Sequence, residues 1–99
     1  MPMPPVRPTG DELRARLALA FPQASLEIFD ESHLHAGHAG AAGGAGHYRV
    51  RVVSERFGGQ SLMARHRLVY DAVRDWMPAR IHALTIEART PGEASVSTD

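Results

Sequence analysis

The sequence predicts a single small α/β domain in which two helices cover one face of a mixed, three-stranded sheet. Its 99 residues are enough for one hydrophobic core and no second module. Apolar residues recur in two segments at helical spacing and alternate in three segments at strand spacing. The resulting order along the chain is helix, strand, strand, helix, strand.

The first helix and the first strand follow a proline-rich start. Residues 1–8 hold four prolines and no apolar periodicity, so we expect a disordered tail there. Thr9 and Glu12 match a capping box, which predicts a helix that begins after Thr9 and stops at Pro22. Residues 24–30 carry apolar side chains at alternating positions and are predicted to form a strand.

A long glycine-rich connection leads to the second strand. Residues 31–46 contain five glycines, five alanines and three histidines without apolar periodicity, which predicts a flexible loop. Residues 47–54 alternate between apolar positions and the polar side chains of His47, Arg49 and Arg51. This alternation predicts a strand with one solvent-exposed face.

A turn and a second helix follow. Residues 56–60 are rich in glycine and are predicted to form the turn. From residue 62 to residue 76, side chains on one helical stripe recur at spacings of four and three, with Ser61 as the N-cap and Pro78 as the stop. His66 falls on this stripe, so we expect it to be buried and hydrogen-bonded. The other side chains predicted to lie in the core or at its edge are Tyr70, Trp76 and Met77, and Phe57 is predicted to anchor the turn.

The third predicted strand covers residues 81–89. Its alternation puts four side chains on one face: His82, Leu84, Ile86 and Ala88. A polar segment follows, in which a helical turn could begin at Thr90. We therefore expect the folded domain to span residues 9–92, with a flexible tail over residues 93–99.

The strand directions divide the chemistry of the domain between two ends. The first two strands should be antiparallel, whereas the second and third are separated by a crossover helix and should be parallel. One end of the sheet, which we call the histidine end, then gathers His33, His35, His38, His47 and His82. The opposite end, which we call the arginine end, gathers Arg56, Gly58, Gly59, Arg65 and Arg67.

The composition argues against several classes of function. The 11 basic residues, all arginine, balance 11 acidic residues, and a net charge of zero argues against binding nucleic acid through the overall field. Cysteine is absent, so the chain supplies neither disulfides nor thiolate ligands. The sequence has no phosphate-binding loop, zinc-protease helix or nucleophile elbow, and we expect no enzymatic activity. Because it also lacks a secretory signal and a long apolar run, we expect a soluble cytoplasmic protein without membrane contacts.

Four strings, spread over roughly residues 11–92, resemble the BolA family. They are Asp30-Glu-Ser-His-Leu-His35, Arg49-Val-Arg-Val-Val-Ser-Glu-Arg-Phe57-Gly58, Ala64-Arg-His-Arg-Leu-Val-Tyr70, and Ile81-His-Ala-Leu-Thr-Ile86 followed by Arg89-Thr-Pro91. The resemblance implies a KH-like fold of the class II type, with the order αββαβ. It also implies a monothiol glutaredoxin as partner, with or without a shared 2Fe-2S cluster, while some family members are described as transcriptional regulators.

The resemblance further implies where the cluster would be held. The family's ligands are a residue in the loop after the first strand and a histidine that opens the last strand, which map onto His35 and His82. The loop here is longer and richer in glycine and alanine than usual, so His33, His38 and His47 remain alternatives. The thiolate ligands would come from a glutaredoxin cysteine and glutathione, and the isolated chain is expected to hold no cofactor and to be a monomer or weak dimer. The segment after Pro91 lacks a tryptophan often found in the family, which puts a final short helix in doubt.

The arginine end supports a second hypothesis, a DNA-binding transcriptional regulator. A Gly-Gly turn that leads into a helix N-terminus offers backbone N–H groups and a partial positive charge to phosphates. Its neighbouring arginines would add cations. A solvated or partner-facing surface is the alternative interpretation, since the sequence offers no aromatic stacking platform there.

Overall fold

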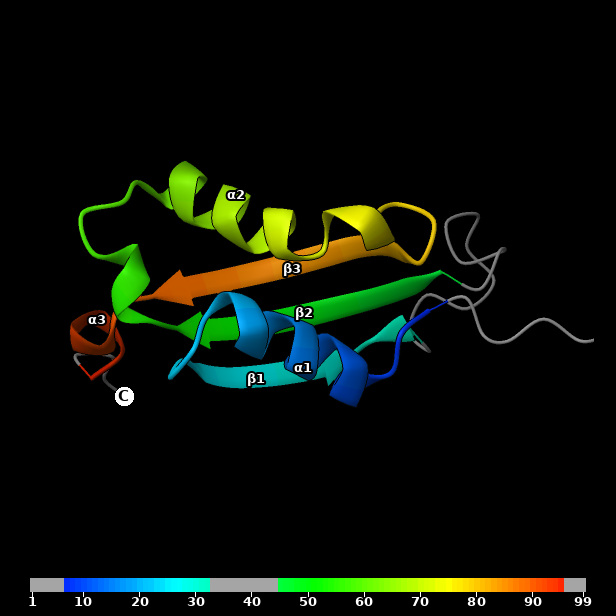
Figure 1. Cartoon of the computed structure of the whole chain (residues 1–99), viewed down its shortest axis with the longest axis horizontal. Helices are drawn as coiled ribbons and strands as arrows, with labels where there is room; N and C mark the ends of the chain where they lie inside the picture. The colour runs from blue at the N-terminus through cyan, green and yellow to red at the C-terminus, as the bar shows by residue number, and fades with distance from the viewer. Residues whose placement is uncertain (1–6, 33–44, 96–99) are drawn as a thin grey trace, which may run out of the picture.

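The computed structural model describes residues 7–32 and 45–95. Its helices and strands are α1 (Gly10–Ala20), β1 (Ser25–Asp30), β2 (Gly46–Val53), α2 (Leu62–Ala72), β3 (Ile81–Arg89) and α3 (Pro91–Ser95). β2 lies in the middle of the sheet, antiparallel to β1 and parallel to β3. Both α1 and α2 lie over the same face of the sheet (Figure 1), so the predicted α/β architecture and strand directions are confirmed.

The core lies between the two helices and one face of the sheet. Phe57 from the turn after β2 packs against Phe21, with the ring centroids 5.3 Å apart, so Phe57 anchors this turn as predicted. Tyr48, Val50 and Val52, which alternate along β2, point into the core and are buried, as expected for a strand with one covered face. The buried core comprises Leu13, Leu17, Phe21, Tyr48, Val50, Val52, Phe57, Val69, Val73, Ile81, Leu84 and Ala88.

The predicted capping box starts α1. The backbone N–H of Glu12 donates to Thr9 Oγ1 at 3.0 Å, and the Thr9 N–H donates to Glu12 Oε1 at 2.8 Å. One turn further, Leu13 and Leu17 are fully buried against the sheet. The helix ends at Ala20, before Pro22, as the sequence predicts.

The ordered chain begins earlier than the sequence suggested. Pro8, assigned above to a disordered tail, is fully buried, and its carbonyl accepts a hydrogen bond from the Tyr48 hydroxyl. Burial of this hydroxyl raises the pKa of Tyr48 to about 12, and the negative charge of Asp30 acts in the same direction. The long-range contact between residues 8 and 48 leaves no trace in local sequence periodicity, which explains the wrong boundary.

The second helix is shorter than predicted and less deeply buried. α2 ends at Ala72, where the Val73 N–H donates to the carbonyl of Tyr70, three residues earlier, as in a 3-10 helix. A separate 3-10 turn over Arg74–Trp76 forms the rest of the predicted segment. Of the predicted core-edge residues, Tyr70 is 38% exposed and donates its hydroxyl to the Leu84 carbonyl, while Trp76 and Met77 are half-buried. His66 is also half-buried, so its predicted place in the core is wrong.

β3 covers the predicted residues, but its pairing with β2 is irregular at the start. Gly46 pairs with Ile81, and His47 pairs with Ala83, which leaves His82 as an extra residue in a β-bulge. As a consequence Ile81 is fully buried whereas His82 is exposed. The prediction that His82 shares the face of Leu84 and Ala88 is therefore wrong.

A short final helix is present despite the missing tryptophan. The Thr90 N–H donates to Glu93 Oε1, and the Glu93 N–H donates to Thr90 Oγ1, so this pair repeats the capping arrangement of α1. α3 extends to Ser95 and crosses the predicted domain boundary at residue 92. It contacts β3 at the arginine end of the sheet (Figure 1).

We predict that Gly46→Ala destabilises the fold. A Cβ atom at this position would overlap Tyr48 Cε2 and would lie 2.8 Å from Tyr48 Cζ, so the buried ring would have to move. The expected loss in the free energy of unfolding is about 1–3 kcal/mol, measured by urea denaturation. Gly10→Ala is the control, because nothing lies within 4 Å of a Cβ atom at Gly10. Equal stability of Gly46→Ala and the wild type would contradict the packing described here.

Candidate functional site

The strand directions bring the starts of β2 and β3 to the end of the sheet where β1 finishes. This is the predicted histidine end, and it holds His47 near the start of β2 and His82 near the start of β3. His33, His35 and His38 lie outside the described residues. At the opposite end, β2 and β3 finish near the Gly58-Gly59 turn, so the described residues His47 and His82 lie at the other end of the sheet from this turn.

His47 and His82 lie next to each other although 34 residues separate them in sequence. Their ring centroids are 5.2 Å apart and the ring planes are tilted by 51°. His82 is exposed, whereas His47 is only 8% exposed and its Nε2 atom is shielded from solvent. The expectation that His47 belongs to a solvent-exposed face is therefore wrong. The bulge in β3 causes this proximity. It interrupts the alternation of the strand, so His82 does not point into the core and lies beside His47.

A set of hydrogen bonds ties the base of the loop to the backbone of His47. The His47 N–H donates to Ser32 Oγ at 3.0 Å, and the Ser32 N–H donates to Asp30 Oδ1 at 2.9 Å. In the opposite direction, the Glu31 N–H donates to the His47 carbonyl at 2.8 Å. Ser32, the last described residue before residues 33–44, is thereby held beside the backbone of His47.

The sequence analysis did not single out Asp30 and Ser32. The available signal was the Asp-x-Ser spacing, because an Asp side chain commonly accepts a hydrogen bond from the backbone N–H two residues later. That spacing predicts a local turn, but it does not predict that the Ser32 hydroxyl reaches residue 47.

The two imidazoles are the candidate metal ligands that the described residues bring together. Imidazole nitrogen is a good ligand for iron and zinc, and the two ring centroids lie 5.2 Å apart, although the Nε2 atom of His47 is shielded from solvent. Among residues 7–32 and 45–95, no group of three or more His, Cys, Asp or Glu side chains is placed to hold a metal ion. Further ligands would therefore have to come from the loop or from a partner.

An exposed aromatic ring lies on the same helix-free face of the sheet as His47. Phe29 is 41% exposed, and the Arg49 guanidinium lies 4.6 Å from the centre of its ring. Arg49 also pairs with Glu31, with Nε and Oε2 separated by 3.2 Å. The surface near the two histidines thus combines an apolar ring with a cation that is itself partly neutralised.

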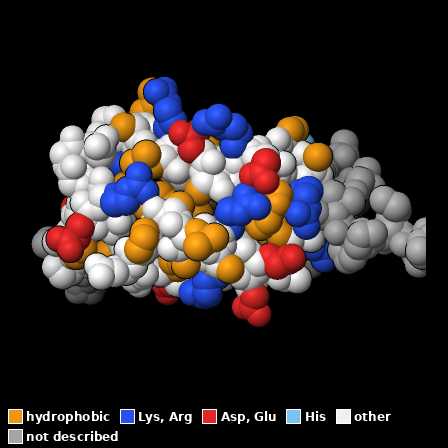
Figure 2. Space-filling view, in the orientation of Figure 1, with side chains coloured by type: hydrophobic (Ala, Val, Ile, Leu, Met, Phe, Trp, Pro, Cys, Tyr) orange, Lys and Arg blue, Asp and Glu red, His pale blue; other side chains and the backbone are white. Residues whose placement is uncertain are grey.

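At the arginine end, the predicted turn is formed but its cations are engaged. Gly59 has φ +72°, a conformation that favours glycine, and the Gly58 N–H donates to the Glu55 carbonyl. The Arg56 guanidinium donates to the Ala20 carbonyl and lies over the Phe21 ring. Figure 2 shows the helix-bearing face, where basic, acidic and apolar side chains are interspersed and form no single basic patch.

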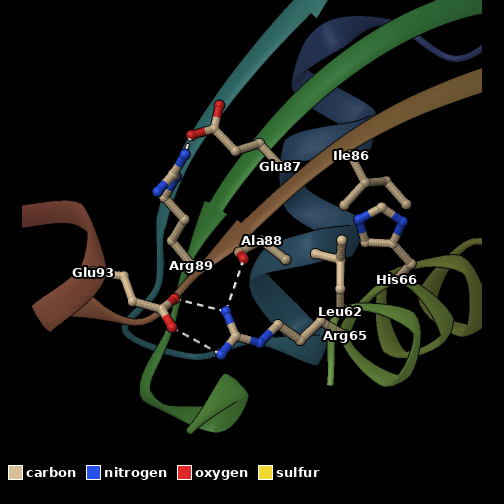
Figure 3. Close-up of a pocket in the computed structure, with 8 residues that line it drawn as sticks. All are labelled: Leu62, Arg65, His66, Ile86, Glu87, Ala88, Arg89 and Glu93. Carbon is tan, nitrogen blue, oxygen red and sulfur yellow. Dashed lines mark hydrogen bonds and ion pairs between the residues drawn. The ribbon is translucent and has the colours of Figure 1, made fainter. Parts of the chain in front are cut away.

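Arg65 is held inside the molecule by α3. Its guanidinium donates to both carboxylate oxygens of Glu93, at 2.6 and 3.0 Å, and to the Ala88 carbonyl at 3.1 Å (Figure 3). These contacts line a groove of about 330 Å³ between α2 and β3, where the ring of His66 also lies. The side chain of Arg65 is only 12% exposed, whereas Arg67 is exposed. Of these two predicted phosphate-binding residues, Arg67 is the accessible one.

We predict that the Glu93 carboxyl titrates far below an ordinary glutamate. Hydrogen bonds from Arg65, followed by that from the Thr90 N–H, lower the pKa of Glu93 to about 2. Since this pKa is lower in the folded than in the unfolded state, the stabilising effect is complete above about pH 4.5 and is lost as the pH falls towards 2. NMR titration of the carboxyl carbon should show this, with Arg65→Gln raising the pKa and Arg67→Gln leaving it unchanged. An equal effect of the two substitutions would rule out the Arg65 contact as the cause.

Comparison with known proteins identifies the family. A family model described as BolA-like protein matches residues 17–93. SufE-like protein 1, chloroplastic/mitochondrial, of Arabidopsis thaliana is 43% identical over 89 residues, which cover 85% of this chain and 24% of that protein. BolA-like protein 1 of Mus musculus is 43% identical over 86 residues, covering 87% of this chain and 61% of that protein. The chain therefore spans about a quarter of the first relative and three fifths of the second.

Two further matches bear on fold and function. The solved BolA domain of SufE1 from Arabidopsis thaliana superposes with a TM-score of 0.74 at 42% identity, covering 85% of this chain and 93% of that domain. A more distant relative, 32% identical over 80 residues, is the DNA-binding transcriptional regulator BolA of Escherichia coli strain K12, with 81% of this chain and 73% of that protein covered.

The matched family bears on the expectation of no enzymatic activity, and the described helices bear on the expectation of no membrane contacts. The description of the matched family model names no catalytic activity. In residues 7–32 and 45–95, no helix is both long and apolar enough to cross a membrane. The cytoplasmic location stays a prediction, and the plant relative's name assigns that protein to chloroplasts and mitochondria. From the family model, the sequence relatives and the superposed BolA domain together, this chain belongs to the BolA family.

Proposed function

We propose that this chain is a partner of monothiol glutaredoxins and shares a 2Fe-2S cluster with them through histidine ligands. Its role would be iron-sulfur cluster trafficking or iron sensing. The observation that carries the proposal is the contact of His47 with His82, whose rings meet at the base of a loop that contains three more histidines. Two imidazoles on one iron, with sulfur ligands on the other, form a known stable type of 2Fe-2S centre.

The chain's own residues would supply the nitrogen side of this centre. His82 is the best placed ligand, because it is exposed near the start of β3 and, as the extra residue of the β-bulge, has no pairing partner in β2. The family resemblance assigns the second ligand to His35, with His33 and His38 as substitutes. His47 is the further substitute that proximity favours, although its Nε2 atom would first have to become accessible.

The absence of cysteine determines what the partner must bring. This chain contains no thiolate, so the sulfur ligands would come from a glutaredoxin cysteine and from glutathione. When bound, the cluster could pass from one protein to the other by exchange of its ligands across the interface. The role of this chain is then to present neutral imidazoles on a fixed rim of the sheet, and no catalytic step is required of it. The isolated chain is expected to be a monomer or weak dimer.

We predict that His82→Ala abolishes cluster sharing. Mixing the wild-type protein with a cluster-loaded monothiol glutaredoxin should change the visible circular dichroism spectrum, and His82→Ala should leave the glutaredoxin spectrum as it was. His66→Ala is the matched control, since His66 lies in the groove on the other side of the domain. His35→Ala and His47→Ala then identify the second ligand. An unchanged spectrum with the wild type, or a wild-type response from His82→Ala, would exclude this assignment.

DNA-binding transcriptional regulation is the second candidate. It is favoured by the name of the Escherichia coli relative and by the exposure of Arg67 in the middle of α2. It is disfavoured by the carboxylate that neutralises Arg65 and by the net charge of zero. The first candidate is therefore preferred.

A salt titration of DNA binding tests this second candidate. If the arginine end contacts phosphates, Arg67→Ala should reduce the slope of log K against log salt concentration by about 1. Arg65→Ala should have a smaller effect, because Glu93 already pairs with that guanidinium. A slope that neither substitution changes would exclude the arginine end as a DNA-binding surface.

A further inference from the structure

We propose that Ser32 is a positioning residue for the two-histidine site, acting through the backbone of His47. The inference rests on the proposed function for its biological meaning, while the positioning itself concerns the folded chain alone. Ser32 is only 7% exposed, and its hydroxyl accepts a hydrogen bond from the His47 N–H at 3.0 Å. Its influence would pass through one hydrogen bond to the residue that packs against His82.

The Ser32 hydroxyl continues the pairing of β1 with β2 beyond its last regular residue pair. That pair is Asp30 with Tyr48. One step further, the Glu31 N–H still donates to the His47 carbonyl, and the His47 N–H donates to Ser32 Oγ. A side-chain oxygen thus satisfies a buried backbone donor at the point where the chain leaves the sheet to form the loop.

A second hydrogen bond fixes the orientation of Ser32 itself. Its N–H donates to Asp30 Oδ1 at 2.9 Å, which closes a tight turn of three residues. The backbone of Ser32 is therefore restrained by the Asp30 carboxylate, and its nearly buried hydroxyl accepts the hydrogen bond from the His47 N–H. Asp30, Ser32 and His47 form a short chain of contacts from β1 to β2.

The bulge transmits this restraint to the exposed histidine. His47 pairs with Ala83 on its other side, and the extra residue His82 lies at the step between Gly46 and His47. The 5.2 Å separation of the two rings depends on where the backbone of residue 47 is held. If the hydrogen bond from His47 to Ser32 is lost, the start of β2 has one restraint fewer and the ring contact should loosen.

The opposite end of the same strand offers a matched control. Ser54 is 6% exposed, directly follows β2, and its hydroxyl accepts a hydrogen bond from the Arg56 N–H at 3.1 Å. Ser32→Ala and Ser54→Ala therefore each remove one nearly buried hydroxyl that accepts from a backbone donor. They differ in which end of the sheet is affected.

The test measures the histidine end in the free protein and in the complex. In the free protein, Ser32→Ala should raise the exchange rate of the His47 amide about tenfold and shift the ring resonances of His82, whereas Ser54→Ala should do neither. With a cluster-loaded monothiol glutaredoxin, Ser32→Ala should weaken the complex about tenfold, as loss of an outer support of a metal ligand typically does. Ser32→Thr keeps the hydroxyl and should restore both properties.

The outcomes separate this proposal from the proposed function. Unchanged His82 resonances and an unchanged complex in Ser32→Ala would overturn the positioning role, and so would equal effects of Ser32→Ala and Ser54→Ala. If the wild type gives no cluster signal with glutaredoxin, the proposed function fails, while altered His82 resonances confined to Ser32→Ala still support the positioning role. If Ser32→Ala fails to fold, the His82 resonances of Ser32→Thr decide, since displaced rings despite the retained hydroxyl contradict the proposal.

Discussion

The placement of His47 and His82 next to each other depends on one irregularity in the pairing of β2 with β3. The parallel strands lose one residue of register between Gly46 and His47, and His82 is the residue left over. This allows Ile81 to fill the core while its neighbour faces outwards beside His47. Without the bulge, strict alternation would direct His82 to the same face as Leu84, and the two rings would lie on opposite sides of the sheet.

Much of the fold was predictable because residues close together in the sequence determine it. The capping box at Thr9, the stop at Pro22 and the strand over residues 81–89 were each predicted from signals that act over a few residues. The structure contains all three, although the alternation within that strand is broken at His82. The sheet directions followed from the lengths of the connections, since a crossover helix implies a parallel pair. These directions were enough to bring His47 and His82 to one end of the molecule.

The remaining features depend on contacts between residues far apart in sequence. No periodicity signals that the Tyr48 hydroxyl reaches Pro8, that Glu93 neutralises Arg65, or that a bulge exposes His82. Each arises from three-dimensional packing, and two of them change a site residue, because the bulge exposes His82 and the Glu93 carboxylate withdraws Arg65 from the surface. The spacing of Glu93 from Thr90 is that of a capping box and predicts their local hydrogen bonds. It does not predict the ion pair of Glu93 with Arg65.

The central claim is that imidazoles of this chain complete an iron site whose sulfur ligands belong to another molecule. Pulsed electron paramagnetic resonance of the reduced complex tests it most directly, with only the histidines of this chain labelled with ¹⁵N. The account predicts strong coupling of the cluster's electron spin to histidine nitrogens of this chain, with the coupling from residue 82 lost in His82→Ala. A reduced cluster in the same complex with no coupling to any labelled nitrogen would contradict it.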